Sequence, residues 1–367
     1  MKIIIAGGGT GGHLYPALAI ASEFKARDSS NELLFVGTLR GLEQKVVPKE
    51  GFNIQFIKVE GIVNVGLFKL LKSLMTIPKG LIQSRAILET FDPHVVIGVG
   101  GYASGPVLAM ASWMGFPTMI HEQNAVPGLT NRLLGNFFVD TVAVTYPDSR
   151  QRFRNDKTFL TGNPVRASIT SGDRQTAMKA LGLDENLFTV FVLGGSRGAH
   201  SLNVAMVDAL KLFSDTGMKK KIQVIHQTGK ADESEVKEKY RQLCAQGIVT
   251  NYLYDMQLAY AAADIVICRA GASTLAELSA CGKASVLVPY PYAARNHQEV
   301  NARKLLDMGA CRMILDKDIS GTSLAACITD LYENPKEVAS MERASRSLVK
   351  PDSAKRVVEL AYELIKQ

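Results

Sequence analysis

Short apolar runs rich in β-branched residues alternate along the chain with longer segments in which apolar positions recur every three to four residues. The short runs have the length and composition of strands that are buried on both faces. Several of them end in glycine, where the chain turns into the next segment. They predict strands at Lys2–Ala6, Leu33–Gly37, Ile54–Val59, Val95–Val99, Thr118–His121, Thr141–Thr145, Phe188–Leu193, Ile222–His226, Val249–Leu253, Asp264–Cys268 and Ala284–Val288.

The longer segments have the spacing of helices. Pro16–Ala26 and Ser201–Leu212 are two of them, and Pro16 is typical of a first helical turn. The tail, Ser353–Lys366, predicts one amphipathic helix with Asp352 as a cap at its start. Continuous apolar strands joined by helices require parallel sheets with both faces covered. The pattern therefore predicts an α/β fold.

The pattern breaks once, near the middle of the chain. Residues Thr161–Gly182 are polar, and a strong predicted strand follows them. The glycine turn at 8–13, GGTGGH, after the first strand is echoed by GGSRGAH at 194–200 after this later strand. Because a domain averages about 150 residues, the 367 residues of the chain fit two similar α/β units in tandem.

Composition narrows the class of protein without fixing its function. Hydrophobic residues make up 47% and charged residues 21%, which excludes a disordered, collagen-like or disulfide-scaffold protein. The net charge of +7 suits an anionic ligand or membrane surface as well as nucleic acid. The five cysteines lack CxxC spacing and are expected to be thiols. The longest apolar stretch, Gly105–Ile120, is shorter than the roughly 20 residues of a spanning helix, so we expect a soluble or peripheral protein.

The first glycine turn has the chemistry of an anion site. Gly7, Gly9 and Gly12 satisfy GxGxxG directly after the first strand. Glycines let the backbone approach an anion, and the next helix directs its free N–H groups and positive dipole end toward it. A dinucleotide fold would need an acid at the end of the second strand, which instead ends Gly37-Thr38. A phosphate site, a dinucleotide site and a tight turn without a ligand all remain open.

Two more glycine turns follow predicted strands. GGYASGP occupies 100–106 in the first half, and GGSRG occupies 194–198 in the second. Two turns in one half suggest a phosphate-rich ligand or two phosphates, and the turn in the other half supplies a separate anion site. Two anion sites across a cleft suit a transfer between two phosphorylated molecules.

Taken together, the motifs resemble those of the GT-B glycosyltransferases, specifically the MurG family. The matching segments follow the family's order over nearly the whole chain: GGTGGH (8–13), GGYASGP (100–106), HEQNAVPG (121–128), GNPVR (162–166), GGSRGA (194–199), CRAGASTLAE (268–277) and HQEVNA (297–302). The resemblance implies two Rossmann-like domains with parallel sheets facing across a deep cleft. Residues 1–163 with the C-terminal helix 350–367 would form an acceptor- and membrane-binding domain, and 164–349 a UDP-GlcNAc-binding domain.

The implied activity is an inverting transfer of N-acetylglucosamine from UDP-GlcNAc to the C4 hydroxyl of MurNAc in undecaprenyl-diphospho-MurNAc-pentapeptide. This step converts lipid I to lipid II in peptidoglycan synthesis, and so serves cell wall formation, cell shape and division. No cofactor and no metal are expected, because the helix start at Gly195–Ala199 with Arg166 can stabilise the leaving diphosphate. One Asp-x-Asp match, Asp316-Lys317-Asp318, lies beyond the nucleotide motifs and is interpreted as turn or cap chemistry.

The resemblance also implies roles for single residues at the donor site. Ser196 with its glycines would bind the pyrophosphate, and Leu253 would touch the uracil through its backbone. Glu277 would accept hydrogen bonds from the ribose hydroxyls, and Gln298, beside His297, would contact sugar hydroxyls. The implied substrate-binding set is Thr10, Gly11, Gly12, Asn124, Arg166, Ser196, Leu253, Ala272, Ser273, Thr274, Leu275, Ala276, Glu277 and Gln298, and the acceptor-binding set is Gly101, Tyr102, Ser104 and Asn131.

The transfer needs a base that takes the proton of the attacking hydroxyl. His13 is the candidate, because it lies where the first glycine turn opens into the cleft. His121 and Glu122 at a strand end are rivals or supporting groups, and a helix-start histidine bonded to the backbone is the alternative for His13. Arg295 departs from the family, which often has an acid two positions before the His-Gln pair; this bears on sugar recognition and not on the reaction.

Residues 61–88 carry Lys69, Lys72, Lys79 and Arg85 and no acidic residue. An apolar stripe of Leu67, Leu70, Leu71, Leu74 and Met75 has helical spacing, and Pro78 is expected to end or kink the helix. Such a helix either packs on the sheet or rests on an anionic leaflet. The resemblance favours the membrane, so we expect a peripheral protein on the cytoplasmic face of the bacterial inner membrane.

Two alternative functions remain open, and the second belongs to a different class of protein. One is another GT-B enzyme such as a UDP-GlcNAc 2-epimerase, which would need no lipid acceptor. The other is a nucleotide-sugar- or nucleic-acid-binding module without chemistry. Against nucleic acid, aromatic residues are only 7% and the chain has no RNP or helix-turn-helix pattern. We expect no nucleic-acid partner.

Overall fold

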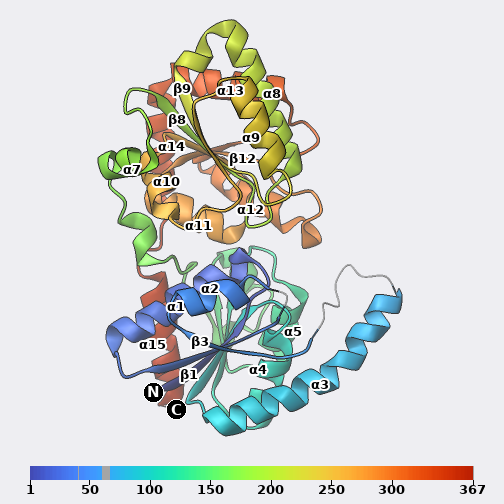
Figure 1. The fold of residues 1–367 in the computed structure, drawn as a ribbon. Helices are drawn as coiled ribbons and strands as arrows, with labels where there is room; N and C mark the ends of the chain where they lie inside the picture. The colour runs from blue at the N-terminus through green and yellow to red at the C-terminus, as the bar shows by residue number, and fades with distance from the viewer. Residues whose placement is uncertain (40, 60–66, 367) are drawn as a thin grey trace. The chain divides into compact units, whose positions relative to one another are not determined.

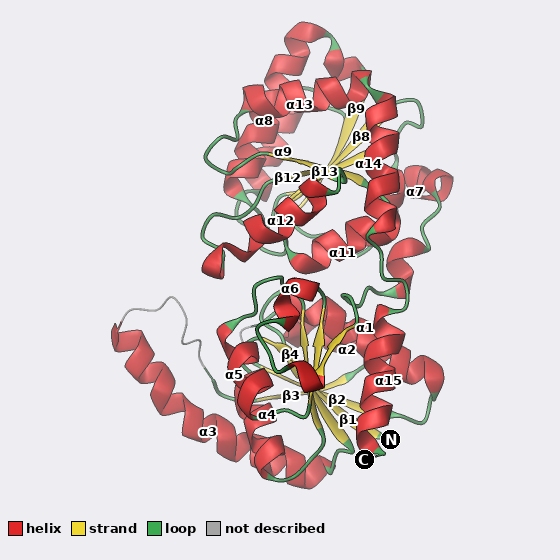
Figure 2. Ribbon diagram, turned by 180° about the vertical axis from the view of Figure 1, so that it is seen from behind, coloured by secondary structure: helices red, strands yellow, loops and turns green. Residues whose placement is uncertain are grey.

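A computed structural model describes residues 1–39, 41–59 and 67–366, and of 67–75 only the backbone. The chain divides into two compact units, Met1–Arg166 with Lys350–Gln367 and Ala167–Val349. We refer to them as the N-terminal and C-terminal domains. The division falls after Arg166, so this residue belongs to the N-terminal domain. In each domain a parallel sheet is covered by helices on both faces (Figures 1 and 2).

Within the described residues, the N-terminal sheet has seven parallel strands in the order β3-β2-β1-β4-β5-β6-β7. The strands are β1 (Lys2–Gly7), β2 (Glu32–Gly37), β3 (Asn53–Phe56), β4 (Val95–Gly100), β5 (Thr118–Glu122), β6 (Thr141–Val144) and β7 (Thr158–Leu160). The central strands β1 and β4 are buried throughout except for Lys2 at the start of β1, as the continuous apolar runs predict. The strand order reverses between β1 and β4, and ligands of such sheets bind at the carboxyl ends of the strands at this switch point.

The helices of the N-terminal domain connect these strands and cover the sheet. They are α1 (Gly11–Arg27), α2 (Glu43–Lys49), α3 (Leu67–Phe91), α4 (Ser104–Trp113), α5 (Leu129–Phe137), α6 (Pro147–Arg150) and α15 (Ser353–Ile365). The end of the chain thus returns to the first domain as α15. The two clusters of buried side chains on the two faces of the sheet include residues of α1 and α15 on one side and of α4 on the other.

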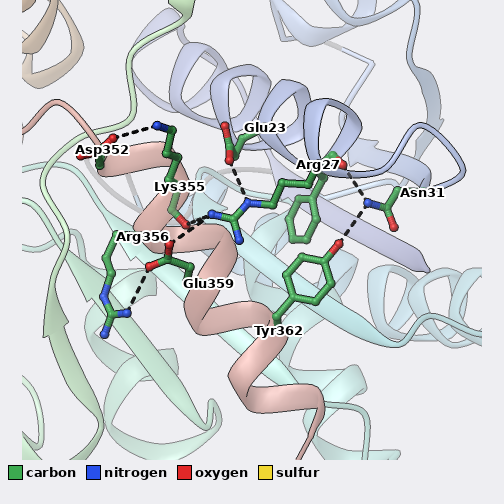
Figure 3. A network of polar contacts seen from close by, with 9 residues as sticks. Glu23, Arg27, Asn31, Asp352, Lys355, Arg356, Glu359 and Tyr362 are labelled. Carbon is green, nitrogen blue, oxygen red and sulfur yellow. Dashed lines mark hydrogen bonds and ion pairs between the residues drawn. The ribbon is translucent and has the colours of Figure 1, made fainter.

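The helix α15 is fixed against α1 by packing and by polar contacts (Figure 3). Arg27 donates to Glu23 at 2.8 Å, to Glu359 at 3.3 Å and to the carbonyl oxygen of Lys355 at 3.1 Å. Beneath them, the rings of Phe24 and Tyr362 have centroids 5.9 Å apart. These contacts explain why the last helix belongs to the N-terminal domain although it follows the C-terminal domain in sequence.

The C-terminal domain repeats the architecture with six described strands in the order β10-β9-β8-β11-β12-β13, again all parallel. The strands are β8 (Phe188–Leu193), β9 (Ile222–Gln227), β10 (Gly247–Thr250), β11 (Ile265–Cys268), β12 (Ala284–Leu287) and β13 (Cys311–Met313). The helices are α7 (Arg174–Leu181), α8 (His200–Thr216), α9 (Glu233–Gln242), α10 (Met256–Ala262), α11 (Ala272–Cys281), α12 (His297–Asp307), α13 (Gly321–Glu333) and α14 (Pro335–Ser347). The order reverses between β8 and β11, which defines a second switch point.

Some local predictions were wrong. Pro16 lies inside α1 and not in its first turn, because the helix already begins at Gly11 at the end of the glycine turn. Pro78 does not end its helix, because α3 continues to Phe91. The strand predicted at Val249–Leu253 is β10, which begins at Gly247 and ends at Thr250. The three-residue strands β7 and β13 were missed, since they are too short to show a pattern.

Other predictions have a simpler outcome. Asp352 occupies the N-cap position of α15, but its side chain makes no capping hydrogen bond. The five cysteines are free. The apolar stripe from Leu67 to Met75 lies outside the residues whose side chains the structure describes. No helix among the described residues is long and apolar enough to cross a membrane.

Candidate active site

At the switch point of the N-terminal sheet, the turns after β1 and β4 cross at backbone distance. The Gly8 amide donates to the carbonyl oxygen of Gly100 at 3.3 Å. Gly101 has φ +86°, and a Cβ there would collide with the carbonyl oxygen of Gly8. Glycine is therefore required by close approach of two loops as well as by the left-handed backbone. The motifs GGTGGH and GGYASGP are thus parts of one structure.

A buried carboxylate that the sequence did not reveal holds the first glycine turn. Glu43, 1% exposed, accepts from the Gly9 amide at 2.7 Å and from the amide and hydroxyl of Thr38 at 3.0 and 3.1 Å. The strand β2 has no acidic residue at its own end, as the sequence shows, but Glu43 on α2 brings a carboxylate to Thr38 at that end. The carboxylate accepts from the Gly9 N–H, so this donor is not available to a ligand phosphate. The only signal was an acidic residue six positions after Gly37.

His13 lies in the first turn of α1, half-buried, and against the turn of β4. Its Nδ1 is 3.0 Å from Oε1 of Gln123. Gln123 in turn donates to the carbonyl oxygen of Val99 at 2.9 Å and lies 3.2 Å from Nδ1 of His121. Sequence reasoning passed over Gln123, although it lies inside the HEQN motif.

His121 and Glu122, the rivals of His13 as base, are both buried and engaged. His121 is inaccessible, its Nε2 is 2.9 Å from the carbonyl oxygen of Gly162, and burial lowers its pKa to about 4. Glu122 accepts from the amides of Asn124 and Gly128 at 2.9 and 3.1 Å and from both neighbouring Asn side chains. This geometry suits groups that shape the loop after β5, so the structure favours supporting roles for them.

The other predicted residues of this domain differ in what they can offer a ligand. Thr10 is exposed at the N-cap of α1, just before Gly11 and Gly12, and Tyr102 is 52% exposed. Ser104 is fully buried, and its hydroxyl bonds the backbone of Ala6 and Gly100, so it fixes the β4 turn.

Asn131 and Arg166 have partners inside the N-terminal domain. Asn131 is buried, and its amide donates to Glu122 at 3.0 Å. Arg166 lies over the ring of Tyr15, 4.2 Å from its centroid, and 3.7 Å from Glu50. These contacts preposition the guanidinium at the end of the N-terminal domain.

At the switch point of the C-terminal sheet, two helices begin close together, each shortly after one of two neighbouring strands. The turn after β8 carries Ser196, half-buried, and leads into α8. The turn after β11 leads into α11, which begins at Ala272 and includes the predicted Ser273, Thr274, Leu275, Ala276 and Glu277. Since β8 and β11 are neighbours, both helix starts lie at one edge of the sheet. Free amides and positive helix ends at such an edge favour a diphosphate.

A second glycine crossing fixes the turn that carries Ser196. Gly198 has φ +81°, and a Cβ there would collide with the carbonyl oxygen of Thr228. Beside it, Gln227 donates to the carbonyl oxygen of Gly195 at 3.0 Å and accepts from the amide of Leu253 at 2.9 Å. Gln227 thus joins the expected pyrophosphate turn to the expected uracil segment. The sequence offered no sign of this role.

Glu277 is 7% exposed on α11 and accepts from the hydroxyl of Tyr260 at 2.9 Å. Gln298 is the second residue of α12, after His297, and its Oε1 accepts from the Tyr290 amide at 2.9 Å. Arg295, the departure from the family, is exposed in left-handed backbone at φ +55°.

The Asp-x-Asp match is part of the protein's own polar network. Asp316 pairs with Arg269 at 2.6 Å and accepts from Ser201 at 2.7 Å. Arg269 also donates to the carbonyl oxygen of Val288 at 3.1 Å. The network therefore joins the ends of β11 and β12 to the start of α8. No group of three or more metal-ligating side chains occurs within the described part of the chain.

Comparison with known proteins agrees with this geometry. The model of the glycosyltransferase family 28 N-terminal domain matches residues 3–144, and that of the family 28 C-terminal domain matches residues 189–357. Two parallel α/β domains and these matches define a two-domain glycosyltransferase of the GT-B class.

A relative from Thermodesulfovibrio yellowstonii, named UDP-N-acetylglucosamine–N-acetylmuramyl-(pentapeptide) pyrophosphoryl-undecaprenol N-acetylglucosamine transferase, is 46% identical over 100% of both chains. The crystal structure of Acinetobacter baumannii MurG superimposes with a TM-score of 0.74 at 27% identity, covering 99% of each chain. This chain belongs to the MurG family of these N-acetylglucosamine transferases. A UDP-N-acetylglucosamine 2-epimerase, 12% identical with a TM-score of 0.68 over 100% of this chain and 97% of its own, shares the fold alone.

Proposed function

We propose that this protein transfers N-acetylglucosamine from UDP-GlcNAc to the C4 hydroxyl of MurNAc in undecaprenyl-diphospho-MurNAc-pentapeptide, which turns lipid I into lipid II. The observation that carries the proposal is the gathering of family motif residues at the switch point of each parallel sheet. The relatives' names supply the substrates, and this chain matches such relatives over its full length.

The C-terminal domain has the groups that a UDP-sugar requires. The turn with Ser196 and the start of α8 offer amides and a positive helix end to the diphosphate, which gains charge as it leaves. Glu277, held by Tyr260, is an acceptor for the ribose hydroxyls. Gln227 keeps the uracil segment at Leu253 in register with the diphosphate turn.

The N-terminal domain has the group that activates the acceptor. His13 takes the proton of the C4 hydroxyl through Nε2, which no described residue occupies, while its Nδ1 is engaged with Gln123. The acceptor oxygen then bonds to the anomeric carbon as the bond to the diphosphate breaks on the opposite face, so the configuration inverts. His121 and Glu122 are inaccessible, so in this proposal they hold the site in shape and do not take the proton.

The test is transfer of labelled GlcNAc to a lipid-linked MurNAc-pentapeptide acceptor, with UDP release measured in parallel. We expect transfer and acceptor-dependent UDP release from the wild type, and a loss of about 10²–10⁴ in kcat for His13→Ala. His94→Ala is the control, because His94 is an exposed histidine of the same domain whose ring accepts from the Lys2 amide. UDP release without the acceptor, or epimerisation of UDP-GlcNAc, would overturn the proposal.

We also propose that the N-terminal domain binds an anionic membrane surface, on the cytoplasmic face of the inner membrane, as a peripheral protein. Support comes from apolar side chains exposed on neighbouring helices: Ile82 on α3, Trp113 on α4 and Phe137 on α5, which are 69, 73 and 76% exposed. Lys79 and Arg132 are exposed on α3 and α5. Aromatic and basic groups together favour the interface of an anionic leaflet.

Vesicle sedimentation tests this surface. Trp113→Ser with Phe137→Ser should lower binding to vesicles containing phosphatidylglycerol, while activity on a water-soluble acceptor remains. Leu212→Ser, which removes an exposed apolar side chain of α8 in the other domain, should bind as the wild type does. Equal binding by all three proteins would exclude these residues from the membrane surface.

A further inference from the structure

Gln123 lies immediately after β5 with 1% of its surface exposed, and both ends of its amide are used. Nε2 donates to the carbonyl oxygen of Val99 at 2.9 Å and faces Nδ1 of His121 at 3.2 Å. Oε1 is 3.0 Å from Nδ1 of His13. A buried amide with every partner satisfied has one orientation, and partners on three elements fix it.

The direction of each hydrogen bond follows from its neighbours. A backbone carbonyl can only accept, so the amide nitrogen must face Val99 and the amide oxygen must face His13. His121 meets the carbonyl oxygen of Gly162 through Nε2, so that nitrogen carries the hydrogen of the neutral ring. Nδ1 of His121 is then free to accept from Gln123.

The same reasoning fixes the tautomer of His13. An amide oxygen can only accept, so Nδ1 of His13 must donate, and the lone pair of the neutral ring lies on Nε2. We propose that Gln123 is a positioning residue that holds His13 in the Nδ1–H tautomer, with Nε2 as the proton acceptor for the acceptor hydroxyl. This inference rests on the proposed function for its catalytic meaning, but the tautomer itself does not depend on it.

The proton balance is complete within the proposed reaction. The hydroxyl O–H bond breaks and its proton goes to Nε2 of His13, while the oxygen forms the bond to the anomeric carbon. The bond from that carbon to the diphosphate oxygen breaks, and its electron pair leaves with UDP. The resulting imidazolium keeps its Nδ1–H on Gln123, so no second proton has to move.

A neutral amide in this position has a different effect from the carboxylate found in many triads. A carboxylate orients the ring and also stabilises the imidazolium, which raises the pKa of the histidine. The amide orients the ring without adding charge. The hydrogen bonds from His13 through Gln123 and His121 to Gly162 all run in one direction, so each polarises the next.

Two substitutions test whether the hydrogen bond to His13 positions its ring. Gln123→Met keeps the volume and removes the hydrogen bonds to His13, Val99 and His121; we expect kcat to fall about 10- to 100-fold with KM for UDP-GlcNAc unchanged, as for a partly misplaced base. Gln123→Glu keeps an acceptor for His13, and its protonated oxygen can replace the donor to Val99; we expect kcat to fall less than in Gln123→Met because His13 keeps its partner.

Gln223→Met is the matched control, because Gln223 is a glutamine of the other domain that is 2% exposed and fully bonded to Asp184 and Thr189. It should lose stability without a change in kcat. Wild-type kcat in Gln123→Met, or a kcat in Gln123→Glu as low as in Gln123→Met, would overturn the proposal.

A measurement without turnover keeps this inference separate from the proposed function. ¹⁵N NMR of histidine-labelled full-length protein, with the His13 signals assigned through His13→Ala, reports which ring nitrogen carries hydrogen. We expect Nδ1–H in the wild type and a mixture of tautomers in Gln123→Met. An Nε2–H ring in the wild type would sink the inference even if the protein transfers GlcNAc, and the expected tautomer would stand even if the transfer assay failed.

Discussion

The carboxylate of Glu43 lies 2.7 Å from the amide nitrogen of Gly9, and this contact makes the first glycine turn a preformed structure. Gly8 and Gly37 leave room for the carboxylate, since a Cβ at either would come within 2.6 Å of a side-chain atom of Glu43. A carboxylate from the protein thus fixes the loop from which His13 projects. The protein itself therefore orders this turn, without a ligand phosphate.

Glu43→Gln should lower both stability and activity. One of the two oxygens becomes an NH₂ group that faces an N–H donor, so we expect a loss of about 1–3 kcal/mol in the free energy of unfolding and a lower kcat. Urea titration and the transfer assay measure the two effects. Glu185→Gln, at an exposed position, should change neither, and a Glu43→Gln protein as stable and active as the wild type would refute the role of this contact.

Gly198→Ala should impair donor binding far more than Gly217→Ala. Both glycines have left-handed backbone, at φ +81° and +74°, but a Cβ at Gly198 collides with Thr228, whereas Gly217 has no atom within 4 Å. The collision adds about 1–3 kcal/mol to the shared backbone cost. We expect KM for UDP-GlcNAc to rise about tenfold or more in Gly198→Ala only. Similar KM values for the two variants would argue against the crossing of the two loops.

Tyr260→Phe should weaken UDP-GlcNAc binding without leaving a cavity in the protein core. The ring remains, and Glu277 loses one donor, worth about 1 kcal/mol or a fivefold rise in KM. Tyr240→Phe is the control, because it removes the hydroxyl of another buried tyrosine, whose partner is His226. If steady-state kinetics give the same KM for both variants, Glu277 is not held for the ribose in this way.

Stability of the C-terminal domain should fall on the acidic side of neutrality. Burial lowers the pKa of His226 to about 3, against 6.5 for the ordinary side chain, so the unfolded chain binds the extra proton between these values. The free energy of unfolding therefore decreases by about 1.4 kcal/mol for each pH unit below about 6.5.

Urea unfolding followed by circular dichroism at pH 7.5, 6.5 and 5.5 measures this dependence. His226→Gln should flatten it by the contribution of one proton, whereas His94→Gln, which replaces an exposed histidine, should not. An unchanged slope in His226→Gln would mean that the buried ring does not set the acid sensitivity.

Much of the architecture could be read from local pattern. The runs at Lys2–Ala6 and Phe188–Leu193 are continuous and apolar because both strands are central and covered on both faces. The glycines after them are required by a positive φ and by the close crossing of two loops, so they stand out as motifs in the sequence. The three-residue strand Cys311–Met313 is too short to show such a run, and for this reason it was missed.

The sequence by itself determined two α/β domains, the family, and the turns where His13 and Ser196 lie, because strand burial and tight turns constrain residues that are close together along the chain. Tertiary structure alone decided what those residues touch. Glu43 reaches Gly9 across 34 positions and Gln123 reaches His13 across 110, and such pairs leave no periodicity in a single sequence. Only the folding of β1, β2, β4 and β5 into one sheet brings these polar groups to the same edge, where burial forces each of them to find a partner.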